Sequence, residues 1–108
     1  MLKIPLVSFI IPTYNSGKSI VRCLKSVSNQ TYPNIEIIII DDCSNDNTLL
    51  KIKKLNLKNL IIIKKNENQG PSKCRNDGIL ACNGKYISIL DSDAYLFPTK
   101  TSKQINFM

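Results

Sequence analysis

Residues 35–42 read Ile-Glu-Ile-Ile-Ile-Ile-Asp-Asp, an aliphatic run that ends on two carboxylates. A near-continuous run of β-branched residues is typical of a strand covered on both faces in a parallel sheet. The run over 35–40 therefore predicts a buried strand with the two aspartates at its carboxyl end. Residues 6–11 (Leu-Val-Ser-Phe-Ile-Ile) predict another buried strand, which stops at Pro12 because proline cannot donate to the ladder.

Apolar residues at helical spacing follow each of these strands. A helix is expected over about residues 17–29, where apolar residues recur three and four positions apart. Its apolar face consists of Ile20, Cys23, Leu24 and Val27. A second helix, capped by Ser44 or Asn45, would turn one apolar side inward. That side consists of Leu49, Leu50, Ile52 and Leu55. Residues 60–63 predict a third strand.

The last third of the chain continues the alternation. Gly70-Pro71-Ser72 predicts the start of a helix that runs through Cys82, and Asn83-Gly84 predicts a left-handed cap at its end. Residues 85–91 predict a fourth strand. The residues after Pro98 show no clear period.

The order strand, helix, strand, helix, strand, helix, strand is typical of an α/β fold with a mostly parallel sheet and flanking helices. A chain of 108 residues is long enough for one core and too short for two. We therefore expect one α/β domain over residues 1–98 and leave residues 99–108 as an unassigned tail. Ligands of open parallel sheets bind beyond the carboxyl ends of the strands, so functional residues are expected there.

The composition excludes several classes of protein. Hydrophobic residues make up 43% of the chain, with only 4 Gly and 5 Pro, so it is neither disordered nor collagen-like. The longest aliphatic run is far shorter than the roughly 20 residues of a membrane-spanning helix. The N-terminal run lacks the cleavage site of a secretory signal peptide. Four cysteines without close pairing, in a chain with no histidine, predict reduced thiols in a cytosolic protein.

The net charge of +7 arises from 15 Lys and Arg against 8 Asp and Glu. Such an excess suits nucleic acid, anionic lipid or a phosphorylated small molecule, and charge alone does not choose among them. Five of the eight acids fall in two short segments: Asp41, Asp42, Asp46, Asp91 and Asp93. This distribution predicts a cation site beside an anion site.

Asp91-Ser92-Asp93 places two carboxylates on the same side of an extended segment, directly after a predicted strand. Without a histidine or thiolate partner, such a pair suits a hard cation, Mg²⁺ or Mn²⁺. This cation would complete its coordination with water and with phosphate oxygens of a substrate. The alternative is structural, with one aspartate capping the next segment and the other solvated.

Other polar residues at predicted strand ends leave alternatives open. Asp42 is suited to accept hydrogen bonds from a ribose or a base, and equally to cap the helix that follows. We expect one of Asp41 and Asp42 to serve a ligand and the other the turn. Lys73 and Arg75 follow Gly70 at a helix start, which suits either an anion or an ordinary entry turn. The sequence has no glycine-rich phosphate loop, which argues against a dinucleotide-binding or P-loop enzyme.

An ordered set of segments runs along the chain. The segments are Val7–Asn15, Asn29–Ile37, Asp41–Thr48, Asn68–Ser72 with Arg75-Asn76, and Gly84–Ile87 leading to Leu90–Asp93. Together they closely resemble the amino-terminal half of family-two glycosyltransferases of the GT-A fold. The resemblance covers about residues 5–98, and several blocks in the right order are far more specific than any one of them.

The resemblance implies a Rossmann-like, GT-A nucleotide-binding half. It assigns nucleotide binding to Pro12, Thr13, Tyr14, Asp42, Lys73, Arg75 and Ser92. Within that set, Asp42 would read the uracil-like base or the ribose. Asp91 and Asp93 would form the D-x-D motif that holds Mn²⁺ or Mg²⁺ against the diphosphate. In the chemistry that the resemblance implies, the metal would stabilise charge on the departing diphosphate while an acceptor hydroxyl attacks with inversion.

The sequence also departs from the family pattern. Cys43 stands where relatives usually carry glycine, and Ala94 follows the D-x-D where another acid is common. The resemblance places the acceptor-binding half and the catalytic base downstream of Met108. No catalytic residue is therefore identified within the chain.

The leading hypothesis is a metal-dependent, inverting, hexosyltransferase-like glycosyltransferase of polysaccharide or cell-envelope biosynthesis. This chain would supply the donor-binding half, with a UDP-linked sugar preferred and a saccharide or lipid-linked acceptor. The alternatives are a non-catalytic nucleotide-binding or regulatory module and, less favoured, a nucleic-acid-binding domain. The 7 aromatic residues and the lack of a recognition helix count against nucleic acid as a partner. We expect a cytoplasmic location, with peripheral association at the inner membrane face and a homodimer as further expectations.

Overall fold

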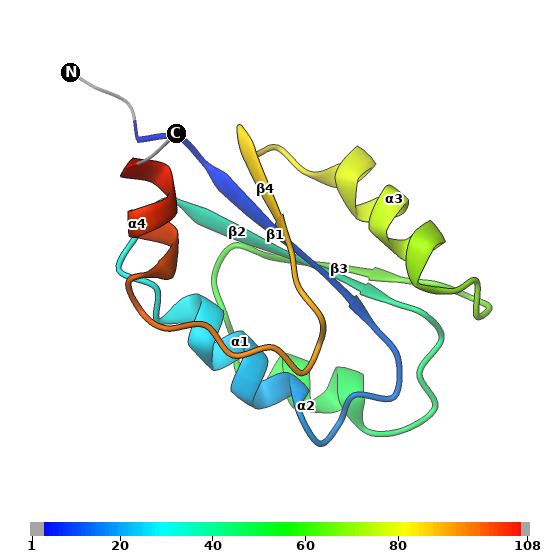
Figure 1. Cartoon of the computed structure of the whole chain (residues 1–108). Helices are drawn as coiled ribbons and strands as arrows, with labels where there is room; N and C mark the ends of the chain where they lie inside the picture. The colour runs from blue at the N-terminus through cyan, green and yellow to red at the C-terminus, as the bar shows by residue number, and fades with distance from the viewer. Residues whose placement is uncertain (1–3, 107–108) are drawn as a thin grey trace.

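The computed structural model describes residues 4–106 and places four parallel strands in one sheet with helices on both faces (Figure 1). The strands are β1 (Val7–Thr13), β2 (Ile35–Asp41), β3 (Leu60–Lys64) and β4 (Tyr86–Ile89), in the order β3-β2-β1-β4. The helices are α1 (Ile20–Ser28), α2 (Thr48–Lys54), α3 (Pro71–Ala81) and α4 (Lys100–Asn106). The predicted α/β fold with a parallel sheet is confirmed.

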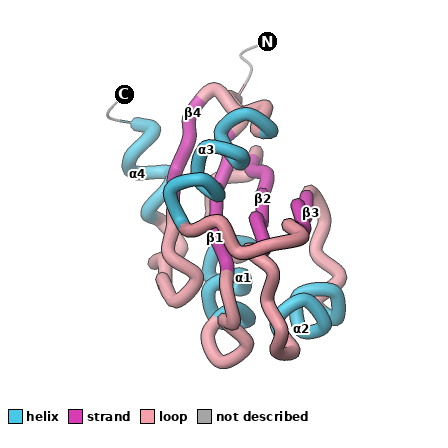
Figure 2. The backbone as a smooth tube through the Cα atoms, turned by 90° about the vertical axis from the view of Figure 1, so that its right-hand side faces the viewer, coloured by secondary structure: helices cyan, strands magenta, loops and turns pink. Residues whose placement is uncertain are grey.

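The two central strands are buried on both faces, as their aliphatic runs predict. One face of the sheet, with Phe9 and Ile39, packs against α1 and α2 in the larger core. The other face, with Ile10 and Ile40, packs against Cys74 of α3 in a smaller core. Figure 1 shows the sheet between α3 on one side and α1 and α2 on the other, and in Figure 2 α3 lies in front of the strands. Two-sided coverage explains why alternation of polar and apolar residues is absent from β1 and β2.

The prediction that the first strand stops at Pro12 is wrong, because β1 continues to Thr13 and Pro12 pairs with Ile40 of β2. In a parallel strand, the backbone groups of residues two apart point to the same neighbouring strand. The Ile10 carbonyl accepts the N–H of Leu90, so position 12 also faces β4, whose ladder with β1 ends at Ile10. Proline is therefore tolerated where no partner strand needs its missing N–H.

The start of α2 also differs from the prediction, since neither Ser44 nor Asn45 caps it. The helix begins at Thr48, whose N–H donates to Asp46 Oδ1 at 3.0 Å. Ile52 is fully buried, but Leu50 is 56% exposed and does not belong to the buried side. The first helix likewise starts three residues later than predicted, at Ile20 rather than 17.

The predicted left-handed cap after the third helix is wrong, because among the described residues neither Asn83 nor Gly84 has a positive φ. Gly84 is instead required by a close approach to β1. A Cβ at this position would lie 2.7 Å from the backbone nitrogen of Ser8 and 2.9 Å from the carbonyl oxygen of Tyr86. The fourth strand is shorter than the predicted 85–91 and ends at Ile89.

The tail left unassigned from the sequence contains α4. The N–H and hydroxyl of Thr101 both donate to the Gln30 side-chain oxygen, at 3.1 and 2.8 Å, and so fix the start of this helix beside α1. The last two residues of the predicted tail, 107–108, lie outside the described part of the chain.

Candidate functional site

The loops after β1 and β2 are joined at the carboxyl edge of the sheet. Asn15 donates its N–H to Ser44 Oγ at 2.8 Å, and its side-chain oxygen accepts the N–H of Asn45 at 2.9 Å. The N–H of Ser16 donates to Thr48 Oγ1 at 2.9 Å. Asn15 adopts a positive φ of 46°, which a short polar side chain tolerates better than most residues. These contacts hold the two loops as one surface.

Of the three residues predicted to line a nucleotide site after β1, one presents its side chain to solvent. Tyr14 is 48% exposed, whereas Thr13 is buried and its hydroxyl donates to the Ile11 carbonyl at 3.0 Å. The Thr13 carbonyl accepts the N–H of Asp42 at 2.8 Å, and Pro12 is half-buried. Tyr14 is therefore the member of the set whose side chain is available to a ligand.

Asp42 lies buried between β2 and the loop that precedes α3. Its Oδ1 accepts the N–H of Gln69 at 2.8 Å, and its Oδ2 accepts the N–H of Gly70 at 2.9 Å. Gly70 has φ +90°, a left-handed conformation that favours glycine. The carboxylate thus fixes the entry to α3, a role for which the sequence offers no local signal.

The electrostatic surroundings keep Asp42 ionised. Burial alone would raise the pKa of this carboxyl group. The N–H groups of Gln69 and Gly70, the Cys74 thiol and the Lys65 ammonium outweigh burial and lower the pKa below its usual value. Conversely, burial and the Asp42 carboxylate raise the pKa of the Cys74 thiol to about 11. Cys74 therefore stays a protonated donor at neutral pH.

Of the two roles expected for Asp41 and Asp42, the structure shows the one in the turn. Asp41 serves the turn, since its Oδ1 accepts the Ser44 hydroxyl at 2.6 Å and its Oδ2 accepts the Ser44 N–H at 3.0 Å. Cys43 between them has φ +67°, the conformation for which glycine is the usual residue. A ligand-binding role for Asp42 stays a prediction.

The positive φ at Cys43 leads to a stability prediction. The change Cys43→Gly is expected to raise the free energy of unfolding by about 1 kcal/mol, because left-handed backbone costs a non-glycine residue roughly 1–2 kcal/mol. Cys43→Ala is the control, since it removes the thiol contact with the Asn66 carbonyl (3.6 Å) but keeps the strained backbone. Urea unfolding checks both variants, and a Gly variant no more stable than the Ala variant would contradict the prediction.

The two predicted phosphate-contacting cations lie on the first turns of α3. The Lys73 ammonium is 3.1 Å from Asp77 Oδ1, and Arg75 donates to Ser72 Oγ at 3.2 Å. Asp77 also binds Lys65. Asp77 is an acid that the sequence reasoning missed, although its spacing of four residues from Lys73 is the usual signal of a helical ion pair. The Asp77 carboxylate therefore offsets part of the positive charge that Lys73 and Arg75 are predicted to offer a phosphate.

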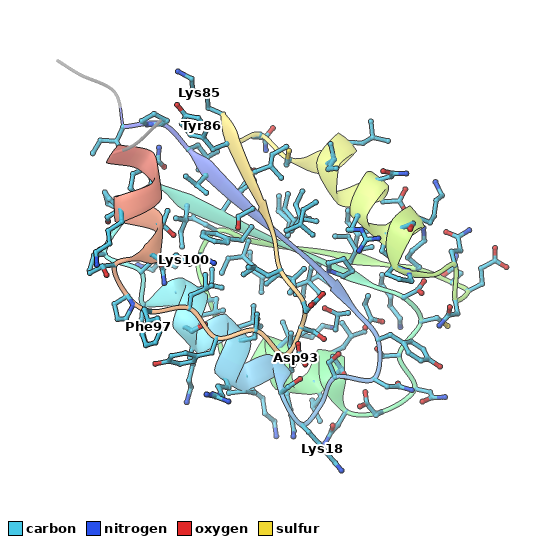
Figure 3. The ribbon with its side chains drawn as sticks, viewed as in Figure 1. Lys18, Lys85, Tyr86, Asp93, Phe97 and Lys100 are labelled. Carbon is cyan, nitrogen blue, oxygen red and sulfur yellow. The ribbon has the colours of Figure 1, made fainter. Side chains whose placement is uncertain are left out.

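Asp91, Ser92 and Asp93 follow β4 at the same edge of the sheet. Figure 3 shows Asp93 beside the amino-terminal end of α1. Both aspartates are exposed, and within residues 4–106 neither carboxylate forms an ion pair. Ser92 is half-buried, and its hydroxyl lies 2.7 Å from that of Ser16. The hydroxyl of Ser92, predicted to bind nucleotide, thus contacts the loop after β1.

The carboxylates of Asp91 and Asp93 fit a hard divalent cation whose remaining ligands are water and phosphate oxygens. Two exposed carboxylates suit Mg²⁺ or Mn²⁺, which keep several waters and accept phosphate oxygens. Within the described residues, no group of three or more His, Cys, Asp or Glu side chains could hold a metal ion. Asp91 and Asp93 would therefore need water and a phosphorylated ligand to complete such a site.

A second feature missed by the sequence reasoning is a row of polar side chains on α1 and at its two ends. These are Ser16, Ser19, Cys23, Ser26 and Gln30, and each contacts the segment 91–101. Their spacing of three and four residues is the available signal, but Cys23 had been counted on the apolar face. Burial and the nearby Asp93 raise the pKa of Cys23 to about 11, so this thiol also stays protonated.

Two buried carboxyl groups make stability depend on pH. Besides Asp42, burial would raise the pKa of Glu36, but hydrogen bonds from Ser8, Asn83 and Gly84 outweigh it and lower this pKa. A lowered folded-state pKa contributes stability that is present above the unfolded-state value and lost as pH falls through the folded-state value. We expect the free energy of unfolding to fall steeply below about pH 4, near the unfolded-state pKa values of both groups.

Urea unfolding between pH 7 and pH 3 checks this pH dependence. Glu36→Gln and Asp42→Asn should each be less stable than the parent at pH 7 and show a shallower loss toward pH 3, because neither amide titrates. A parent chain equally stable at pH 7 and pH 3 would contradict the prediction.

A hollow of about 390 Å³ lies at the opposite, amino end of β2 and β3. Its lining residues include Ile35, Leu57, Leu60 and the buried Glu36. The carboxylate there is already engaged by Ser8 and Asn83. This hollow is separate from the loops that carry Asp42 and Asp91, which remain the candidate site.

The comparisons with known proteins agree with the resemblance drawn from the sequence. A family model described as glycosyl transferase family 2 matches residues 8–108. The Escherichia coli protein named UDP-Glc:alpha-D-GlcNAc-diphosphoundecaprenol beta-1,3-glucosyltransferase WfaP is 46% identical over 95% of this chain. The match spans only 41% of that relative. The part of the chain that the structure describes contains no helix long and apolar enough to cross a membrane.

Solved structures share the fold at high similarity. TarS from S. aureus in complex with UDP has a TM-score of 0.89 and 35% identity, over 94% of this chain and 31% of that one. A mannosyltransferase from Pyrobaculum calidifontis, in complex with GDP-Man and Mn²⁺, has a TM-score of 0.82 and 26% identity. It covers 92% of this chain and 30% of its own. The chain thus spans less than half the length of these relatives.

Proposed function

The chain belongs to glycosyl transferase family 2, and on that premise we propose that it binds a nucleotide-diphosphate sugar together with a divalent cation. The carrying observation is the 2.7 Å contact between the Ser16 and Ser92 hydroxyls. This contact sets the exposed Asp91 and Asp93 beside the loop that presents Tyr14. WfaP is named for a UDP-linked donor and TarS is found with UDP, which supports uridine over guanosine as the base.

In the proposed complex, Asp91 and Asp93 hold Mn²⁺ or Mg²⁺, and Tyr14 and Asp42 belong to the nucleotide site. The cation supplies stabilisation of the negative charge on the departing diphosphate. Lys73 and Arg75 add positive potential, which Asp77 partly offsets. The Mn²⁺ in the mannosyltransferase complex supports a divalent cation of this kind.

We further propose that the sugar passes with inversion to an acceptor hydroxyl, in polysaccharide or cell-envelope biosynthesis. The chain would then supply the donor-binding part of the enzyme. The name of WfaP, which specifies a lipid diphosphate-linked sugar as acceptor, supports a saccharide or lipid-linked acceptor. No general base is assigned among residues 4–106, and its place after Met108 stays a prediction.

Calorimetric titration of UDP, with and without Mn²⁺, tests donor binding. We expect Mn²⁺ to tighten binding in the parent chain, and Asp91→Ala/Asp93→Ala to weaken Mn²⁺-dependent binding by at least about 100-fold, because both carboxylate ligands are lost. Glu67→Ala is the control, since it removes an exposed carboxylate from a different loop and should leave the affinity unchanged.

The outcomes separate the alternatives. Binding of UDP that is unaffected by Mn²⁺ and by the double change would contradict the metal site. Tight, salt-sensitive binding of RNA by the double variant would favour the nucleic-acid alternative. Release of UDP from UDP-glucose that depends on a saccharide acceptor would exclude a non-catalytic nucleotide-binding module.

Peripheral association with an anionic membrane is a further part of the proposal, with a cytoplasmic location. A hollow of about 470 Å³ beside α1 is lined in part by Lys18, Arg22, Lys25 and Tyr95. Phe97 (labelled in Figure 3) follows this region of the chain. It is 73% exposed, and its ring packs edge-on against that of Tyr95. Cations beside exposed aromatic rings suit a headgroup layer. Sedimentation with phosphatidylglycerol vesicles, and not with phosphatidylcholine vesicles, is the expected result; equal recovery with both would contradict it.

The expected homodimer also stays a proposal. Exposed apolar side chains on α3 and on the free edge of β4 support it: Ile79, Leu80, Ile87 and Ile89. Light scattering over a range of protein concentrations tests this proposal. A constant monomer mass would contradict it.

A further inference from the structure

One stripe of α1 and its flanking turns is polar where a core-facing helix would ordinarily be apolar. Its members are Ser16, Ser19, Cys23, Ser26 and Gln30. Steps of three, four, three and four residues keep them on one side of the helix. Ser16, Cys23, Ser26 and Gln30 are buried. Buried polar groups need partners, and all of these residues find them in the segment 91–101.

The amino-terminal members of the stripe bind the D-x-D residues themselves. The Ser16 and Ser92 hydroxyls are 2.7 Å apart, and the Ser19 hydroxyl donates to the Ser92 carbonyl at 3.2 Å. The Cys23 thiol donates to the Asp91 carbonyl at 3.7 Å. Ser92 is thus held through both its side chain and its backbone.

The use of Ser19 is informative because this residue stands at the N-cap of α1. A serine there ordinarily accepts a helix N–H through its side chain. The Ser19 side chain forms no capping hydrogen bond and contacts the Ser92 carbonyl instead. The helix gives up a common local stabilisation in favour of a contact with the D-x-D segment.

The carboxyl-terminal members hold the same segment further along. Ser26 accepts the N–H of Leu96 at 3.1 Å, and Gln30 donates to the Phe97 carbonyl at 2.8 Å. Figure 1 shows the segment after β4 running back along α1 toward α4. Both sides of Asp93 are therefore tied to α1 and to the turns at its two ends.

We propose that Ser16 and Ser19 are positioning residues for the divalent cation, acting through Ser92. Ser92 lies between Asp91 and Asp93 in the chain. Contacts that fix its hydroxyl and carbonyl therefore limit the range of positions that the two carboxylates can adopt. Two exposed side chains on a loop would otherwise lose conformational freedom on binding the cation. This inference rests on the proposed function, because it assumes that Asp91 and Asp93 bind the metal.

The test measures metal binding rather than turnover. The Mn²⁺ affinity of the 108-residue chain is measured by electron paramagnetic resonance, and UDP affinity by calorimetry with and without Mn²⁺. The variants are Ser16→Ala, Ser92→Ala and the double change. Ser28→Ala is the matched control, because this exposed serine of α1 bonds only within the helix, to the Lys25 carbonyl at 3.1 Å.

Each single change should weaken Mn²⁺-dependent affinity about tenfold, as loss of an outer-shell partner does. The double change should cost no more than Ser16→Ala alone, because Ser92→Ala removes a contact that Ser16→Ala also removes. Ser16→Ala removes in addition the bond from the Ser16 hydroxyl to the Tyr14 carbonyl at 3.1 Å. For Ser16→Ala, UDP affinity without metal should stay close to that of Ser28→Ala. Ser92→Thr, which keeps the hydroxyl, should restore the affinity.

Contrary outcomes are distinct. Single variants that match the parent, losses that multiply in the double variant, or equal losses without metal would each overturn the positioning role. Suppose that the parent chain and Ser16→Ala bind Mn²⁺ equally well and Asp91→Ala/Asp93→Ala does not bind it. This result would support the proposed function but refute the inference. A parent chain that binds neither Mn²⁺ nor UDP refutes both.

Discussion

Replacing Gly78 with valine is expected to lower the free energy of unfolding by about 3 kcal/mol, at the upper end of the usual cost of overpacking. Gly78 and Cys74, one turn apart, are the buried residues of α3. A Cβ at Gly78 would lie 2.5 Å from Ile10 Cγ2 and 2.7 Å from Ile40 Cδ1. Ile10 is β-branched and fully buried in β1, so it has little room to move. The helix would have to lift off the sheet.

The control for this prediction is Asn76→Val, which places the same side chain on the exposed side of α3. It should change stability by less than about 0.5 kcal/mol, as surface substitutions usually do. Urea unfolding followed by circular dichroism compares the two variants. Equal stability of Gly78→Val and Asn76→Val would show that α3 does not depend on this close approach.

The order of elements was predictable because burial on both faces leaves a strong pattern. Residues 37–40 must be apolar on both sides to sit between α3 and the helices α1 and α2, and no surface strand needs such a run. Boundaries were less predictable. Ser44 and Asn45 are residue types that often cap a helix, but the N-cap of α2 is Asn47. Ser44 is taken up by Asp41 and by the N–H of Asn15.

The place of a candidate site residue was predictable where it depends only on the end of one strand. It was not predictable where it depends on hydrogen-bond partners far away in the sequence. Asp91 and Asp93 lie beyond the carboxyl end of a strand, as expected, although this strand, β4, is half-buried or exposed along its length. The partners of Asp42 lie 27 and 28 residues further along the chain, in a loop that only the fold brings near. The polar stripe of α1 was not predicted, because serine and cysteine at helical spacing are also common as small residues of a core.

Replacing Asp42 with alanine is expected to lower the free energy of unfolding by about 3 kcal/mol. Each charge-assisted hydrogen bond contributes roughly 1.5–3 kcal/mol, and the N–H groups of Gln69 and Gly70 both lose their acceptor. Gln69 is exposed, so water can replace part of the loss, which keeps the total below the sum of two full bonds. Asp42→Asn should cost about 2 kcal/mol, because its amide turns a donor toward one of the two N–H groups.

Glu67→Ala is the control for Asp42→Ala, since it removes a carboxylate from the exposed part of the same loop. It should stay within about 0.5 kcal/mol of the parent in urea unfolding. If Asp42→Ala were as mild as Glu67→Ala, the carboxylate would not be what fixes the entry to α3.

The variant Asp42→Asn separates a structural role of Asp42 from a ligand-binding role. A carboxylate has about four lone-pair sites, and the N–H groups of Gln69 and Gly70 and the Cys74 thiol use three of them. Contact with a base or ribose is therefore compatible with the observed bonds. At a temperature where Asp42→Asn is fully folded, loss of a direct contact should weaken UDP binding about tenfold and leave Mn²⁺-dependent pyrophosphate binding unchanged. Equal weakening for both ligands would mean that Asp42 acts only by holding the loop of Gly70.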